Sequence, residues 1–177
     1  MKDIFQELYD QYHHDLYKFI FYMVKEKVTT EDILQEVYIK VLNSYDTYQG
    51  KSSKKTWLFS IAKHVTIDHF RKQGRRKQYS DQYFDIQESG ERLRDTEPLP
   101  EEIAETNESM RQLYLALEEC SEDQKMVTIL RYIQDLSIRE TAEILNWSTS
   151  KVKTTQHRAL KQLQATMNQK EGMNDES

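Results

Sequence analysis

Glycine and proline, the residues that most often interrupt regular structure, are scarce in this chain of 177 residues, which holds four glycines and two prolines. Sheet-rich folds need many hairpin turns, and such turns rely on these two residue types. Their scarcity therefore argues against a sheet-rich fold. Apolar residues make up 37% of the chain and charged residues 31%, a composition that still allows buried cores. We expect an all-α protein.

Cysteine is almost absent as well. Because Cys120 is the single cysteine, the chain cannot form an internal disulfide bond. No spacing of cysteine and histidine is typical of a structural zinc site, and we expect no metal and no cofactor. Residues 1–10 lack the apolar core of a signal peptide, and no apolar run reaches the roughly 18 residues of a membrane span. These observations predict a cytoplasmic protein.

Acidic residues are scarce in one part of the chain, although the net charge is −5. Residues 81–123 hold 14 acidic and 3 basic residues, whereas residues 124–170 hold 3 acidic and 8 basic residues. Residues 71–77 form a second basic stretch. Since the sign of charge in a segment decides which partners it attracts, the acidic net charge does not exclude DNA as a partner.

Apolar residues recur every three to four positions in two groups, a pattern typical of amphipathic helices. The first group predicts three helices, over about 3–26, from a cap at Thr29 or Thr30 to about Gly50, and from Lys55 to Gly74. The second group predicts four helices, over about 110–117, 126–133, 138–145 and 152–163, the last two short. Residues 73–105 contain both prolines and few large aliphatic side chains, which predicts a flexible acidic linker.

Residues 137–152 have the pattern of a helix-turn-helix. Ala142 is small where two helices cross, Asn146 can adopt the left-handed turn conformation, and Val152 can pack back against the first helix. Ser148 or Thr149 is expected to cap the second helix. The outer face of that helix carries side chains suited to phosphates and base edges: Lys151, Lys153, Thr154, His157, Arg158 and Lys161. The alternative is an ordinary helical hairpin with a charged solvent face.

Two stretches on either side of the linker resemble the extracytoplasmic-function (ECF) group of bacterial RNA polymerase sigma factors, within the sigma-70 family. The first comprises residues 31–41 and 56–71, and the second comprises the helix-turn-helix with the preceding Gln124–Arg131 segment. Together they cover nearly the whole chain except the linker and the tail. The resemblance implies a sigma2-like helical bundle over 1–72, the linker over 73–105, a sigma4-like domain over 106–168 and a tail over 169–177.

The resemblance also implies a function. Such a factor binds core RNA polymerase, directs it to promoters through the −10 and −35 elements, assists promoter melting and initiates transcription, here of a stress or envelope regulon. It is not an enzyme and has no small-molecule substrate. The expected partners are core polymerase, promoter DNA and an anti-sigma factor, which can be membrane-bound. The expected location is the cytoplasm, in association with the nucleoid.

Carried onto this sequence residue by residue, the resemblance assigns three surfaces. Polymerase contact falls to Asp32, Gln35 and Glu36, the −10 element to Trp57, Ser60, Lys63 and His64, and the −35 element to Lys153, Thr154, His157 and Arg158. Independently, a groove for single-stranded DNA needs cations beside aromatic rings, as supplied by Lys54, Lys55, Lys63 and Arg71. His64 replaces the family's common Asn, and Cys120-Ser121 replaces a common Leu-Pro at the start of a helix.

These surfaces predict how the −10 element is opened. We expect the loop 50–55, with Ser60, Lys63 and His64, to capture a base flipped out of the non-template strand, because DNA melting needs compensation for the lost base stacking. Plainer interpretations remain. The acidic face of the second helix could be merely solvated, Trp57 could be a core anchor, and His64 could cap or pack on its own helix.

Two other functions stay open at this point. One is a transcription regulator that uses the same helix-turn-helix and dimerises through its first domain. The other is an all-helical metal hydrolase, suggested by His64 and Asp68 at a spacing that could share one metal. Asp68 can equally pair with a neighbouring Arg or Lys on its helix.

Overall fold

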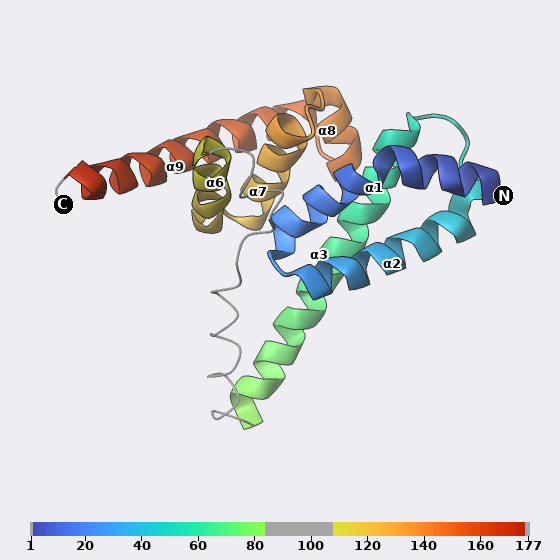
Figure 1. The fold of residues 1–177 in the computed structure, drawn as a ribbon, viewed down its shortest axis with the longest axis horizontal. Helices are drawn as coiled ribbons and strands as arrows, with labels where there is room; N and C mark the ends of the chain where they lie inside the picture. Colours follow the sequence, from blue (N-terminus) through green and yellow to red (C-terminus); the bar gives the residue numbers. More distant parts are fainter. Residues whose placement is uncertain (1, 84–107, 176–177) are drawn as a thin grey trace.

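The computed structural model describes residues 2–83 and 108–175, and every regular element in these ranges is helical. The elements are α1 (Lys2–Val24), α2 (Lys27–Ser44), η1 (Tyr45–Thr47), α3 (Lys54–Tyr83), α6 (Glu108–Ala116), η3 (Leu117–Glu119), α7 (Glu122–Thr128), η4 (Ile129–Ile133), α8 (Ile138–Leu145) and α9 (Thr149–Asp175). Figure 1 labels the α-helices among them. The predicted all-α class is confirmed. Most of the predicted linker, residues 84–105, lies outside the described residues. None of the described helices is long and apolar enough to cross a membrane.

Helices α1, α2 and α3 pack together into a first group (Figure 1). Its core contains residues of the predicted apolar stripes, such as Phe19 of α1 and Val37 of α2, and also Phe59 of α3, which the predicted stripe did not include; all three are completely buried. The rings of Phe19 and Phe59 meet edge to face, with 5.6 Å between their centroids. Since full burial of one such side chain stabilises a fold by about 1.5–3 kcal/mol, these stripes hold the three helices together.

The start of α2 differs from the prediction of a Thr29 or Thr30 cap. Helix α2 begins at Lys27, after Glu26 in extended conformation, and Thr30 lies buried inside the helix. The Thr30 hydroxyl donates to the carbonyl oxygen of Glu26 at 2.7 Å. The prediction was wrong because Lys25 adopts a φ of 60°, which turns the chain before the threonines, and the Thr30 hydroxyl is satisfied within the helix.

Two helices are longer than predicted. Helix α3 continues through Gly74 to Tyr83, and its last turns extend beyond the other helices (Figure 1). Helix α9 continues through Gly172 to Asp175, so most of the predicted tail is helical. A glycine in a helix costs only about 1 kcal/mol relative to alanine, and the surrounding Gln, Lys and Arg residues favour the helix. The predicted end at Gly74 and the predicted short final helix are therefore wrong.

Helices α6, α7, α8 and α9 form a second group, in which capping residues define where helices begin. The Ser121 hydroxyl accepts from the Gln124 N–H at 3.2 Å, and the Gln124 side chain accepts from the Ser121 N–H at 3.1 Å. This reciprocal cap starts α7 without the family's common Leu-Pro. Ser137 and Glu140 form the same arrangement at the start of α8.

The two groups are not separated in this structure. Helix α3 packs on α8, and α1 packs on α7 and η4. We call this interface the seam, and its polar contacts join Asp15, Lys25 and Lys55 of the first group to Tyr114, Glu118 and Gln134 of the second. The seam decides which predicted site residues face solvent.

Candidate polymerase and nucleic-acid interfaces

The helix-turn-helix has the geometry that its sequence predicts. Asn146 ends α8 in the left-handed conformation, with φ 57° and ψ 46°, and the Trp147 N–H donates to the carbonyl of Ala142 at 3.0 Å. Ala142 is 6% exposed and Val152 is fully buried, so both pack at the helix crossing. The Ser148 hydroxyl accepts from the Lys151 N–H at 3.1 Å and caps α9. The predicted roles of these residues in the turn are confirmed.

Helix α9 has one buried side and one exposed outer face. Val152, Ala159 and Leu163 are buried against the other helices. The outer face is exposed throughout and comprises Lys151, Lys153, Thr154, His157, Arg158 and Lys161. The ammonium group of Lys151 lies 4.1 Å from the centre of the Trp147 ring, a cation–π contact at the turn. The structure thus brings all six predicted residues onto one accessible helix.

Arg131 of η4 holds α9 in place through a side-chain hydrogen bond, and it was not among the residues singled out from the sequence. Its Nε donates to the side-chain oxygen of Gln156 at 2.8 Å, and its guanidinium also donates to the Leu136 carbonyl at 2.5 Å. Because Gln156 lies on α9 and Leu136 precedes α8, Arg131 fixes the position of the second helix relative to the first. The only signal in the sequence was an arginine placed within an apolar helical stretch.

The outer face of α2 is accessible. Asp32, Gln35 and Glu36 are exposed, opposite the buried stripe of the same helix. Ile39, 58% exposed, and Leu42 continue this face towards the end of α2. Exposed large apolar residues beside acidic ones are typical of a surface that binds another protein, and the sequence reasoning did not identify this apolar part.

Trp57 lies at the start of α3 in a packed aromatic cluster. Its ring lies 4.8 Å from that of Tyr48 and 6.1 Å from that of Tyr45, centre to centre. The hydroxyl of Tyr48 donates to the Ser52 carbonyl and closes the loop that carries Gly50, whose φ is 69°. Trp57 therefore holds the loop against the helix, as expected of a structural anchor.

The other predicted −10 residues divide between solvent and the seam. Lys54, His64 and Arg71 are exposed, and the Ser60 hydroxyl donates to the Thr56 carbonyl at 2.9 Å. Lys55 instead reaches across the seam, where its ammonium group lies 3.5 Å from the Gln134 carbonyl oxygen. Lys63 is half-buried and faces the second group. The structure does not leave the whole predicted −10 surface open.

The environment of α3 sets the charge of two of these groups. Burial and the nearby Arg71 lower the pKa of Lys63, while Asp123 opposes that shift. Burial and the Lys63 charge lower the pKa of His64, with Asp68 opposing them. His64 is therefore neutral at pH 7, with one ring nitrogen as a donor and the other as an acceptor.

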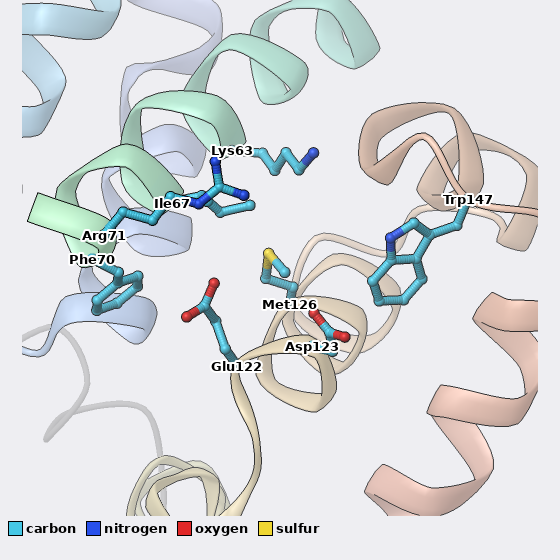
Figure 2. Close-up of a pocket in the computed structure, with 8 residues that line it drawn as sticks. All are labelled: Lys63, Ile67, Phe70, Arg71, Glu122, Asp123, Met126 and Trp147. Atoms are coloured by element: carbon cyan, nitrogen blue, oxygen red, sulfur yellow. The ribbon is translucent and has the colours of Figure 1, made fainter. Parts of the chain in front are cut away.

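A pocket of about 370 Å³ lies between the two groups of helices. Figure 2 shows Lys63, Ile67, Phe70 and Arg71 of α3 on one wall, facing Glu122, Asp123 and Met126 of α7, with Trp147 at one side. Cations thus face carboxylates across the pocket.

Metal-ligating side chains do not cluster in residues 2–83 and 108–175. No three His, Cys, Asp or Glu residues in these ranges are placed to hold a metal ion. Burial raises the pKa of the Cys120 thiol, so this thiol stays protonated at neutral pH.

Comparison with known proteins decides the family. Residues 8–76 match Sigma-70 region 2, and residues 110–163 match Sigma-70, region 4. The chain is 55% identical over 178 residues to the "ECF RNA polymerase sigma factor SigX" of Bacillus subtilis (strain 168). The aligned region covers 99% of this chain and 91% of that relative. The chain belongs to the ECF RNA polymerase sigma factors of the sigma-70 family. It therefore binds core RNA polymerase and directs it to promoters, and it is not an enzyme.

Solved structures agree with this ECF sigma factor family. The sigma factor RpoE of Bartonella quintana, crystallised with the anti-sigma factor NepR, is 25% identical, with a TM-score of 0.77 over 95% of this chain and 98% of that chain. CnrH, in complex with the cytosolic domain of CnrY, is 17% identical and has the same fold, with a TM-score of 0.68 over 95% of this chain and 90% of that chain. The predicted sigma-factor family is confirmed, and the dimerising regulator and the metal hydrolase are set aside.

Proposed function

We propose that three helical surfaces divide the recognition of polymerase and promoter between them. The α2 face with Asp32, Gln35 and Glu36 binds core polymerase, α3 binds the −10 element, and α9 binds the −35 element. The first two surfaces belong to a domain of residues 1–72, and the third to a domain of residues 106–168. The observation that carries the proposal is the outer face of α9, where all six candidate residues are exposed on the second helix of a capped helix-turn-helix.

On α9, position along the helix separates two kinds of contact. The second helix of such a motif enters the major groove with its first turns. Lys153 and Arg158 are assigned to base edges, while Lys151 and Lys161, which flank them along the helix, are assigned to phosphates and carry no sequence information. Thr154 and His157 complete the face between them. Arg131 acts as a positioning residue, because it fixes α9 through Gln156.

On α3, the loop 50–55 and the first turns of the helix capture an unpaired base of the −10 element. Ser60 and His64 supply hydrogen-bonding groups, and Lys54, Lys55, Lys63 and Arg71 follow the single-stranded backbone. Neutral His64 can both donate and accept, so it can discriminate between bases as an amide would. Trp57 supports this site by packing on Tyr48 and fixing the loop.

We also propose that an anti-sigma factor, either free or membrane-bound, inhibits this chain in the cytoplasm, where the active factor works with polymerase at the nucleoid. Support comes from the RpoE structure with NepR, because its likeness extends over both groups of helices rather than over one. The surfaces that such an inhibitor must cover are the exposed faces of α2 and α9.

The test is run-off transcription with core polymerase on a promoter library, followed by sequencing of the transcript starts. Arg158→Ala is compared with Asn168→Ala, which alters an exposed α9 residue outside the proposed face. The proposal expects Arg158→Ala to relax selection at one position of the −35 element and Asn168→Ala to leave selection unchanged. Equal loss on every −35 sequence with Arg158→Ala would refute its role as a reader of bases.

A further inference from the structure

The pocket in Figure 2 has the size and position of a small-molecule site. Its volume of about 370 Å³ lies near the lower end of the range of about 300–1,000 Å³ that is usual for such sites. Small-molecule sites also occur preferentially between separately packed parts of a protein, and this pocket lies between the two groups of helices. We propose that it binds a dipeptide with free termini and large apolar side chains, as a ligand and not as a substrate. The proposal does not rest on the roles assigned to the helices in promoter recognition.

Opposite charges line two walls of the pocket. Lys63 and Arg71 lie on the α3 wall, and Glu122 and Asp123 lie on the α7 wall. All of these residues are among those that the structure describes, and no ion pair joins one wall to the other. Each wall therefore presents its charge to the space between the walls. A ligand that matches both walls needs an anionic group for the α3 wall and a cationic group for the α7 wall.

The two charges on each wall have the same sign, which makes a charged ligand group favourable there. Burial and the nearby Arg71 charge lower the pKa of Lys63, so the protonated form of Lys63 is held at a cost. A carboxylate placed between Lys63 and Arg71 offsets this cost, because it supplies opposite charge and accepts hydrogen bonds from both cations. An ammonium group has the same effect beside Glu122 and Asp123, which are adjacent in the sequence and exposed.

The surface between the charged walls is apolar. It consists of Ile67 and Phe70 of α3, Met126 of α7 and Trp147 from the turn after α8. Met126 is buried, and the other three are half-buried. Aromatic rings and a thioether contact many apolar side chains favourably, because such contacts need no specific pattern of hydrogen bonds. The pocket should therefore select a ligand by its apolar bulk as well as by its two charges.

These features favour a dipeptide over other small molecules. A single amino acid carries both charged groups on one carbon atom, whereas the charges of this pocket lie on two separate helices. A dipeptide adds one residue between them, about 3.3–3.6 Å of extended chain. Longer peptides fit poorly into a volume near the lower end of the usual range. Polyamines and phosphates are disfavoured, because one of the two walls repels them.

Calorimetric titration of the full-length chain tests the site, with leucyl-phenylalanine as the probe. Three related compounds each lack one feature: the N-acetylated form lacks the cation, the C-terminal amide lacks the anion, and glycyl-glycine lacks the apolar side chains. The probe should bind one to one, and each related compound should bind at least about tenfold more weakly, as expected for one lost contact. In a Trp57→Phe background, saturation should change the fluorescence of Trp147, which lines the pocket.

Two substitutions with matched controls test the two charged walls. Arg71→Gln removes a cation from the α3 wall, and Arg75→Gln removes one from an exposed position of the same helix outside the pocket. Glu122→Gln and Glu119→Gln form the corresponding pair for the α7 wall. Each pocket variant should weaken binding of the probe by about tenfold, and each control should bind it as the wild type does. Circular dichroism checks that every variant is folded.

Combining variants with modified peptides assigns each end of the peptide to a wall. N-acetylation should cost less affinity in Glu122→Gln than in the wild type, and amidation should cost less in Arg71→Gln, because each combination removes the same contact twice. Undiminished losses in both combinations would contradict the proposed orientation. No saturable binding of leucyl-phenylalanine, equal affinity for its blocked forms, or equal losses in pocket and control variants would each overturn the site. Since these measurements involve neither polymerase nor DNA, such a failure leaves the proposed function unaffected.

Discussion

Helices α3 and α9 are both proposed to contact DNA, and both carry basic residues on one side, but their surfaces differ in accessibility. On α9, all six candidate residues are exposed, because the opposite side of the helix supplies the whole of its packing. On α3, Lys55 and Lys63 face the second group of helices, while Lys54 and His64 face solvent. A basic helix in a sequence therefore does not reveal whether it is free for DNA or occupied within the same chain.

The two helices also differ in their acidic neighbours. No acidic residue of α7 or α8 is among the contacts described for the outer face of α9, whereas the first turn of α7 brings Glu122 and Asp123 to the basic side of α3. We propose that core polymerase binds the exposed α2 face of the first group, which is part of neither proposed DNA surface. The variants below separate these three surfaces.

The largest effect is expected from changes to the α2 face, because a chain that does not bind core polymerase cannot direct it to either promoter element. Asp32→Lys/Glu36→Lys reverses two exposed charges on α2 and should weaken association with core polymerase by about 100-fold, within the 2–5 kcal/mol typical of disrupted interfacial charge pairs. Fluorescence anisotropy with labelled protein measures the affinity. Asp3→Lys/Glu7→Lys is the control, with the same charge change and spacing on exposed α1 residues. Equal affinity for the two double variants would exclude the α2 face.

A large effect confined to α9 is expected for Arg158→Ala. Loss of one good base contact costs about 1–3 kcal/mol, and the middle of that range corresponds to a roughly 30-fold loss of affinity for the preferred −35 sequence. Competition binding of the holoenzyme to DNA with each base at every −35 position measures it. The loss should disappear on DNA that carries a different base at the contacted position.

A smaller effect on α3 is expected for His64. His64→Asn should keep a donor and an acceptor and change which base is preferred, whereas His64→Ala should reduce discrimination at that position by about tenfold, as expected for one lost hydrogen-bonded contact. Transcription from templates with every base at each −10 position tests both variants. Unchanged base preference and unchanged open-complex yield in both would show that His64 does not read a base.

The smallest effect is expected for Lys161→Gln on α9. One lost phosphate contact should weaken binding similarly on all sequences and reduce the slope of log affinity against log salt by about 0.9. Holoenzyme binding to −35 DNA between low and moderate salt measures the slope, with Asn168→Gln as the control. A loss that depends on the −35 sequence would make Lys161 a reader instead.

Local chemistry explains which features were predictable from the sequence. Ala142, Asn146 and Val152 predicted the helix-turn-helix because each is required by geometry within a few residues. The buried stripes of α1–α3 followed from periodicity. Thr30 and Gly74 misled because a threonine can bond within a helix and one glycine does not stop a helix among good helix formers. Both errors concern boundaries, where local signals are weakest.

The seam was not predictable in the same way. Its contacts join residues separated by the linker, such as Lys25 with Glu118 and Lys55 with Gln134, and each pair looks like ordinary surface chemistry in the sequence. Arg131 is similar, because its partner Gln156 lies 25 residues further along the chain. Long-range polar contacts leave no periodic signal, so the accessibility of the α3 surface could only be found in the structure.

The most direct test of the assignment of α3 to the −10 element and α9 to the −35 element is cleavage of promoter DNA by a tethered iron chelate in the holoenzyme. In a Cys120→Ser background, the chelate is attached to Lys51→Cys in the loop before α3 or to Ser150→Cys in the first turn of α9, both at exposed positions. The account predicts cuts at the −10 element from position 51 and at the −35 element from position 150. Cuts at the same element from both positions, or with the two elements exchanged, would contradict it.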